Sequence, residues 1–287
     1  MNKILCGTLL LVLFFTSCKK TTTIVEEPIT PTPTTPTEPK VYSFETTPSW
    51  SDEFDVNGLP NNQIWGYDVG GGGWGNNELQ NYTANDLDNA KVENGNLIVT
   101  AIKEPSGTRQ YSSARLVTKG KKDMKYGRLE LKAKVPAGLG SWPALWMLAS
   151  QTTFGSTYWP DQGEIDIMEH VGYDPSVVHA SVHTNLFNHV LRTQQTAKTI
   201  VPTFNSVFHV YRMDWTPDEI KVFLDDKEFF VFKKQGALWQ EWPFSQPQHL
   251  LINIAVGGNW GGLKGVDDAI FPIKLEVDYV RYYPLKQ

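Results

Sequence analysis

GRLELKAKV, residues 127–135, has the clearest strand pattern in the sequence and indicates the fold class. Apolar residues occupy every second position of its sequence from Leu129 onward, and charged residues stand between them. Successive side chains of a β-strand point to opposite faces, so this alternation predicts a strand with one buried face and one solvated face. The apolar positions are Leu129, Leu131, Ala133 and Val135.

Other short segments rich in β-branched and aromatic residues also read as strands, separated by turn formers such as Asn94-Gly95 and Asp225-Asp226. The sequence has no long stretch with a helical period and no internal repeat. We therefore expect an all-β fold, a jelly roll of two antiparallel sheets packed as a sandwich, with a concave face that can hold a long ligand. The segments are NLIVTAI (96–102), VVHASVH (177–183), FHVYRMDW (208–215), EIKVFLDD (219–226), EFFVF (228–232), HLLINIAV (249–256) and KLEVDYVRYY (274–283).

Residues 1–17 have the features of a lipoprotein signal peptide. Lys3 precedes an apolar run, Ile4 to Phe15, that is too short for a membrane-spanning helix. The motif FTSC that follows is similar to a bacterial lipobox, in which the cysteine is lipidated and becomes the mature N-terminus. This cysteine is Cys18; the alternative is an ordinary signal peptide cleaved near Ser17.

Residues 18–40 are predicted to be a tether. Thirteen of the twenty residues from 21 to 40 are Thr or Pro, a composition that cannot bury an apolar face and favours an extended chain. The two cysteines of the chain, Cys6 and Cys18, both precede this tether, so we expect no disulfide in the body.

Residues 41–287 form the expected folded domain and contain all ten tryptophans. Their length suits a single all-β domain. The formal net charge of the chain is −5, and basic residues cluster only at 119–125, which argues against a nucleic-acid partner. We expect a monomer.

GEIDIMEH, residues 163–170, places three carboxylates in a strand-like stretch. Burying a carboxylate costs several kcal/mol unless it is paired or hydrogen-bonded. Strand periodicity puts Glu164 and Asp166 on one face but Glu169 on the other, with the isoleucines. A β-bulge near Ile167-Met168 inserts one residue and returns Glu169 to the face of the other acids. We therefore predict a bulge at this point.

Three acids on one face suit the hydrolysis of a glycosidic bond. A retaining glycosidase needs a nucleophilic carboxylate and a proton donor about 5–5.5 Å apart, with pKa values that differ. Asp166 can hydrogen-bond Glu164 and keep it charged, while the crowded negative charge raises the pKa of Glu169. The alternative is a structural acidic patch or a metal site that includes His170, but this spacing matches no common metal motif.

The chain resembles family 16 of the glycoside hydrolases, whose signature is E-x-D-x-x-E on a bulged strand. The resemblance is to the bacterial endo-β-1,3-glucanase branch, the laminarinases and their mixed-linkage relatives. Seven blocks carry it in the same order as in the family: WSDEF (50–54), GWGNNELQNYT (73–83), SARLVTKG (113–120), GSWPALWML (140–148), QGEIDIMEHVG (162–172), NIAVGGNWGG (253–262) and VDYVRYY (277–283).

This resemblance implies a jelly roll and internal cleavage with retention of configuration. It implies that Glu164 is the nucleophile, Asp166 its helper and Glu169 the acid/base, with no cofactor in the chemistry. The implied substrate is a β-1,3-glucan or a mixed β-1,3/1,4-glucan. The E-x-D-x-x-E spacing is laminarinase-like and differs from the shorter E-x-D-x-E of lichenases.

Aromatic side chains are candidates to bind sugar rings, whose faces are apolar. For any single tryptophan the alternative is core packing, and we assign Trp50, Trp65 and Trp215 to the core. Pro143 indicates that its strand is at a sheet edge or begins there. The substrate-binding candidates are Trp142, Trp146, Trp159 and Trp260.

Polar candidates come from the resemblance, which places Asn76, Arg115 and His183 beside the sugar hydroxyls. A structural histidine is the alternative for His183. Its strand, 177–183, follows the acidic strand and could pair with it.

A structural calcium ion, far from the cleft, is also implied by the resemblance. The matching positions are Glu53, the backbone carbonyl of Gly95, and Asp278. Oxygen ligands of this kind suit calcium. The alternative is an Asp that caps a turn.

Other functions stay open at this point. A non-catalytic β-glucan-binding protein on the same fold would be expected to lose one of the acids. A hydrolase of agarose or carrageenan and a transglycosylase are further alternatives. We expect an exported lipoprotein of the outer membrane, anchored by lipid and exposed at the cell surface, because a long tether suits a polymeric substrate.

Overall fold

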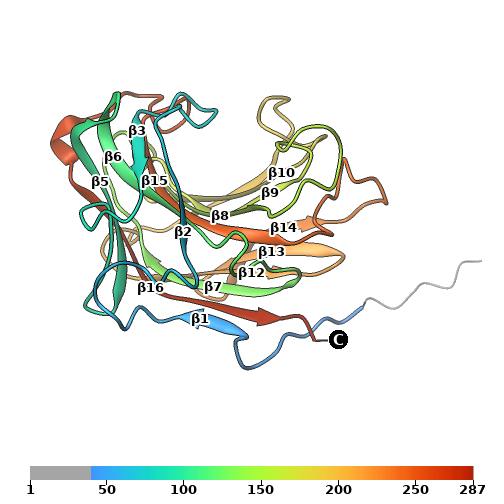
Figure 1. The fold of residues 1–287 in the computed structure, drawn as a ribbon. Coiled ribbons are helices and arrows are strands. Elements are labelled where there is room, and N and C mark those ends of the chain that lie inside the picture. Colours follow the sequence, from blue (N-terminus) through green and yellow to red (C-terminus); the bar gives the residue numbers. More distant parts are fainter. Residues whose placement is uncertain (1–39, 287) are drawn as a thin grey trace, which may run out of the picture. The chain divides into compact units, whose positions relative to one another are not determined.

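A computed structural model describes residues 40–286, and the body from Val41 onward forms one compact unit (Figure 1). The predicted signal peptide, the lipidation site at Cys18 and almost all of the tether lie outside the described residues. Within the described part of the chain, no helix is long and apolar enough to cross a membrane.

Two layers of strands lie one over the other (Figure 1). One layer has the order β11 (Gln195–Ile200), β10 (Val177–His183), β9 (Glu164–Glu169), β8 (Ser141–Ala149), β15 (Gln248–Val256) and β6 (Arg109–Val117). The other has the order β5 (Asn96–Ser106), β16 (Ile273–Pro284), β7 (Gly127–Lys134), β12 (His209–Trp215), β13 (Glu219–Leu224) and β14 (Lys227–Lys233). The predicted antiparallel two-sheet sandwich is therefore confirmed.

The two layers are continuous, because β5 pairs with β6 and joins them along one edge. Among the described strands one pair is parallel, β3 with β6. Short elements complete the fold: β1 (Trp50–Asp52), β2 (Gly66–Asp68), β3 (Gln80–Thr83), β4 (Ala90–Glu93) and a 3-10 helix, η1 (Asp268–Ile270).

The core fills the space between the layers. The apolar positions of β7 are buried and the charged positions between them are partly exposed, as the alternation predicts. Every residue of β15 is buried, because this strand has the core on one face and a cleft on the other. Trp65 and Trp215 are fully buried, and Trp50 packs at the margin of the core.

The predicted turns have the backbone that their residues favour. Asn94 and Gly95 both have positive φ and connect β4 to β5, whose last pair is Glu93 with Asn96. This is the two-residue hairpin turn that Asn-Gly forms readily. Such turns set the register of the strands that they join.

The interpretation of Pro143 is wrong, because β8 lies inside the sheet between β9 and β15 and begins at Ser141, two residues before the proline. Pairing of β8 with β9 ends at Ala144 and Glu169, one residue short of the proline. The missing N–H of Pro143 therefore leaves no gap in that ladder, and its carbonyl accepts a hydrogen bond from the N–H of His170.

Candidate active site

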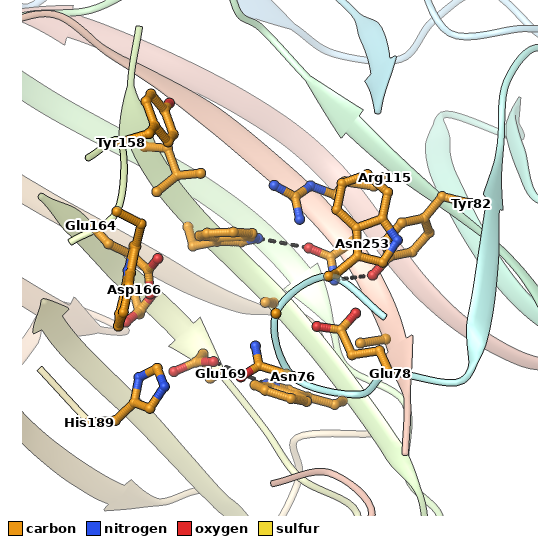
Figure 2. Close-up of a pocket in the computed structure, with 18 of the residues that line it drawn as sticks. Asn76, Glu78, Tyr82, Arg115, Tyr158, Glu164, Asp166, Glu169, His189 and Asn253 are labelled. Atoms are coloured by element: carbon orange, nitrogen blue, oxygen red, sulfur yellow. Dashed lines mark hydrogen bonds between the residues drawn. The ribbon is translucent and has the colours of Figure 1, made fainter. Parts of the chain in front are cut away.

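The acidic strand β9 contains the predicted bulge. Asp166 pairs with Trp146 of β8, and Glu169 pairs with Ala144, so three residue steps on β9 oppose two on β8. The pairing with β10 shifts at the same point. Ile167 and Met168 are both buried in the core. As a result, Glu164, Asp166 and Glu169 all reach the opposite face, where they line one cleft (Figure 2).

This cleft has a volume of about 390 Å³ and lies over the concave layer. β9 forms one side, β8 and β15 form the floor, and the segment before β3 forms the other side. Sequence-predicted residues that line it are Asn76, Arg115, Trp142, Trp146, Trp159, Glu164, Asp166 and Glu169.

The three acids are buried together, and burial raises the pKa of each well above its ordinary value. Repulsion by Asp166 raises the pKa of both glutamates further. Carboxylates this close cannot all be ionised without a large electrostatic cost, so the group holds protons at neutral pH. This is the electrostatic requirement for a proton donor.

His183 lies in contact with Glu164 and Asp166. It pairs with Glu164 across β9 and β10, and its Nε2 lies 3.7 Å from Oε1 of Glu164 and 3.3 Å from Oδ2 of Asp166. An imidazole at this position favours the ionised form of its neighbours when it is protonated. The contact of Asp166 is therefore to His183, whereas the sequence predicted a hydrogen bond from Asp166 to Glu164. His183 lies beside the acids and does not line the open part of the cleft.

Two tryptophans of β8 form the floor. The indole N–H of Trp142 donates a hydrogen bond of 3.0 Å to Oε1 of Glu169. The indole N–H of Trp146 donates one of 2.7 Å to Asn253 of β15, and the amide of Asn253 donates to the hydroxyl of Tyr82. These bonds fix the ring planes of the two tryptophans, and both side chains line the cleft.

Arg115 lies at the far side of the floor. Its guanidinium stacks 4.8 Å from the ring of Trp146 and 4.7 Å from that of Trp74, and its Nε lies 3.0 Å from a carboxylate oxygen of Asp68. The charge of Arg115 is thus balanced within the protein, while its side chain still lines the cleft.

Trp159 lies at one end of the cleft, with its ring 5.0 Å from that of His189 and 6.1 Å from that of His183. Trp260 has a different place from the other predicted tryptophans. Its ring packs edge-on against Trp142, 5.4 Å away, and against His179, 5.1 Å away. Trp260 therefore supports Trp142 on the floor but does not itself line the cleft.

The sequence-based interpretation did not select several cleft residues. Glu78 and Tyr82 have the same strand parity as Asn76 within GWGNNELQNYT, and that parity is a signal that could have found them. Asn253 and Trp74 stand in recognised blocks but were not singled out. His189 and Tyr158 come from segments without a periodic pattern.

The sequence profile of the glycosyl hydrolases of family 16 matches residues 77–281. The chain belongs to family 16 of the glycosyl hydrolases. The β-glucanase of Rhodothermus marinus is 55% identical to this family-16 chain over 239 residues, covering 82% of this chain and 84% of the relative. Hydrolysis in this family depends on its carboxylates and needs no catalytic cofactor.

Solved structures of the family have the same fold. The crystal structure of the laminarinase from Rhodothermus marinus has a TM-score of 0.83 and 52% identity, covering 86% of this chain and all of that one. The structure of a non-specific endo-β-1,3(4)-glucanase has a TM-score of 0.78 and 42% identity, covering 85% and 92% of the two chains. The chain is therefore a family-16 glycoside hydrolase.

The residues of the predicted calcium site do not fit a calcium ion as they are arranged. Both oxygens of the Glu53 carboxylate accept hydrogen bonds from Arg281, at 2.9 and 2.7 Å. Asp278 forms an ion pair of 2.6 Å with Lys132. Gly95 occupies the hairpin turn between β4 and β5. A divalent cation would have to displace Arg281 from Glu53 and Lys132 from Asp278. The calcium site stays a prediction.

Proposed function

We propose that this protein is a retaining endo-β-glucanase that hydrolyses internal linkages of β-1,3-glucans and of mixed β-1,3/1,4-glucans. One observation carries the proposal above all: the bulge in β9 puts three carboxylates on one side of a tryptophan-lined cleft. A charged and a protonated carboxylate close together are the machinery of double displacement at a glycosidic carbon.

Glu164 is the nucleophile in this mechanism. Its carboxylate attacks the anomeric carbon, and the bond from that carbon to the leaving oxygen breaks. Glu169 transfers its proton to the leaving oxygen, so the departing sugar leaves as a neutral alcohol. Glu169 is then an ionised base, and it takes a proton from water as the water attacks the glycosyl-enzyme and releases Glu164.

Asp166 and His183 position the nucleophile. Asp166 lies between the two glutamates in the sequence, and with His183 it forms a polar neighbourhood for Glu164. Trp142 holds Glu169 through its indole N–H. The reacting pair therefore has different surroundings at its two ends, which separates the roles of two otherwise identical side chains.

A neutral glucose polymer fits the lining of the cleft. Trp142 and Trp146 offer rings to the apolar faces of glucosyl units, and Asn76 and Arg115 offer donors to their hydroxyls. Relatives named laminarinase and non-specific endo-β-1,3(4)-glucanase support both laminarin and mixed-linkage glucan as substrates.

A non-catalytic glucan-binding protein is the principal alternative, and the presence of all three acids argues against it. Hydrolysis of agarose or carrageenan, and transglycosylation, are separated by their products. The test measures sugar released from laminarin, barley mixed-linkage glucan and agarose by the protein and by Glu164→Gln. We expect release from the two glucans only, and none from the variant. Binding without release would identify a glucan-binding protein.

We infer that the enzyme is an outer-membrane lipoprotein. The lipobox-like FTSC and the Thr/Pro-rich tether support this, and a surface position would bring the cleft to a polymer that cannot enter the cell. Metabolic labelling with a radioactive fatty acid should mark the wild type and not Cys18→Ser. Protease added to intact cells should then remove the enzyme if it faces outward.

A further inference from the structure

The cleft contains a fourth carboxylate, Glu78, which the mechanism does not use. It lies just before β3, across the floor from the acidic strand (Figure 2). The residue is 6% exposed, and its backbone forms an antiparallel bridge with Gly257 after β15. Glu78 is therefore held against the floor of the cleft and is not a mobile surface acid.

One oxygen of this carboxylate is fixed by the protein. The amide nitrogen of Gln80 donates a hydrogen bond of 2.7 Å to Oε2 of Glu78. Gln80 is fully buried, and its side-chain oxygen Oε1 accepts a hydrogen bond of 2.8 Å from the backbone N–H of Val256. Gln80 thus connects Glu78 by hydrogen bonds to the backbone of β15 and fixes the orientation of the carboxylate.

No ion pair neutralises Glu78 within residues 40–286. Arg115 is close enough to lower the pKa of Glu78, but burial has the larger effect and raises it. The ion pair of Arg115 is with Asp68. Protein donors next to Glu78, among them Gln80, lower its pKa less than burial raises it, and the hydroxyl groups of a sugar would supply further donors.

The charge of the cleft also restricts what can bind. Four carboxylates line it, and Arg115, the one Lys or Arg among its described lining residues, is already paired. Burial already raises the pKa of all four carboxylates, so a sugar that carries a carboxylate or a sulfate would add a further negative charge to a partly desolvated site that disfavours it. A neutral sugar meets acceptors for its hydroxyls.

We propose that Glu78 is a substrate-binding residue that accepts a hydroxyl hydrogen bond from a neutral glucosyl unit and excludes anionic sugars from the cleft. This role rests on the proposed glucanase function and adds the selection of substrate by charge. Glu78→Gln removes the charge and conserves the shape of the side chain. The amide oxygen at position 78 can still accept the hydrogen bond from Gln80.

The test compares two polymers that differ in charge: laminarin, and laminarin whose C6 hydroxymethyl groups have been partly oxidised to carboxylates. Binding is measured by calorimetry in Glu164→Gln protein, which does not consume the polymer, with Glu or Gln at position 78. The matched control is Glu45→Gln, which makes the same charge change at an exposed position on the N-terminal segment that pairs beside β16.

With Glu at position 78, we expect at least tenfold weaker binding of oxidised than of neutral laminarin, a difference that shrinks in about 0.5 M salt. Glu78→Gln should weaken the binding of neutral laminarin about tenfold and should reduce the discrimination. Glu45→Gln should change neither. In otherwise wild-type enzyme, Glu78→Gln should raise KM for laminarin more than it lowers kcat.

Equal binding of neutral laminarin by the Glu and Gln forms, with unchanged discrimination, would overturn the role of Glu78 and leave the glucanase function standing. If the difference in affinity between neutral and oxidised laminarin did not change with salt, this difference would not be electrostatic. If the Glu164→Gln protein with Glu at position 78 bound neither polymer, the glucan substrate itself would be wrong.

Discussion

The indole N–H of Trp142 donates a hydrogen bond of 3.0 Å to Oε1 of Glu169. Trp142 belongs to β8 and Glu169 to β9, and the bulge in β9 brings the glutamate to the face on which the indole lies. One side chain therefore both forms the floor for a sugar ring and orients the proposed proton donor. The bond also stabilises the ionised form of Glu169, which opposes the effect of burial on its pKa.

Trp142→Phe keeps an aromatic ring and removes this donor. We expect kcat to fall about tenfold, because a hydrogen bond to a charged group is lost from the acid/base. The pKa of Glu169 should rise, so the alkaline limb of the pH profile should move to higher pH. The check is kcat/KM for a laminarin oligosaccharide from pH 5 to 10. Trp239→Phe, which alters a ring stacked on Phe154, is the control. A limb that moved to lower pH would contradict the assignment.

The proposed acid predicts the pH dependence of the wild type. Burial, followed by repulsion from Asp166, raises the pKa of Glu169 to about 8. The protonated form is present below that pKa, so activity should be lost as the pH rises through about 8. Asp166→Asn removes the repulsion, and its alkaline limb should move to lower pH while kcat also falls. Asp88→Asn, an exposed aspartate outside the cleft lining, should leave the profile unchanged. If the alkaline limb of Asp166→Asn stayed at the wild-type pH, Asp166 would not be the group that raises the pKa of Glu169.

Glu169→Gln should stabilise the fold. The folded-state pKa of Glu169 is raised by burial from 4.5 to about 8, so in this window the unfolded chain is ionised while the folded protein holds the proton. The free energy of unfolding of the wild type therefore falls as the pH rises from 4.5 to about 8. The Tm gain of the variant should be near zero at pH 4.5 and reach roughly 5 °C above pH 8. Calorimetry across this pH range measures the difference in Tm between the variant and the wild type, with Glu45→Gln as control. A difference that does not grow with pH would contradict a buried, protonated Glu169.

The sequence predicted local features well because their information is local. The alternation of GRLELKAKV set the buried face of β7, and the parity conflict at Glu169 predicted the bulge at Ile167-Met168. The Asn94-Gly95 turn has the conformation that its residues favour. Each of these follows from the geometry of one strand or one turn.

Features that depend on strand order could not be predicted in the same way. Asn253 meets Trp146 and Tyr82 because β15 lies between β8 and β6, and because β3 pairs with β6 in parallel. The hydrogen bond from Gln80 to Glu78 and the contact of His183 with Asp166 likewise join partners whose positions follow from tertiary pairing. The sequence placed Pro143 at a sheet edge or at the start of its strand, because propensity carries no information about where a neighbouring strand ends.

The bulge itself can be tested by deletion. Removing Met168 converts E-x-D-x-x-E into a regular alternation, which keeps all three acids on the cleft face but loses one buried side chain from the core. We expect lower stability, by about 2–5 kcal/mol, with measurable hydrolysis. Removing Ile165 also shortens β9 by one residue, but it turns Glu164 toward the core and should abolish activity. Equal inactivity of two folded deletion variants would show that the bulge does more than restore parity.

Double displacement at Glu164 releases a product with a defined anomeric form, and the anomer that appears first distinguishes this mechanism from inversion. Proton NMR should follow the hydrolysis of a laminarin oligosaccharide by the wild type and by Glu164→Gln within the first minutes, before mutarotation. We predict that the wild type releases the β-anomer first and that the α-anomer appears later. Glu164→Gln should release neither. Initial release of the α-anomer, or unchanged release by Glu164→Gln, would contradict double displacement at Glu164.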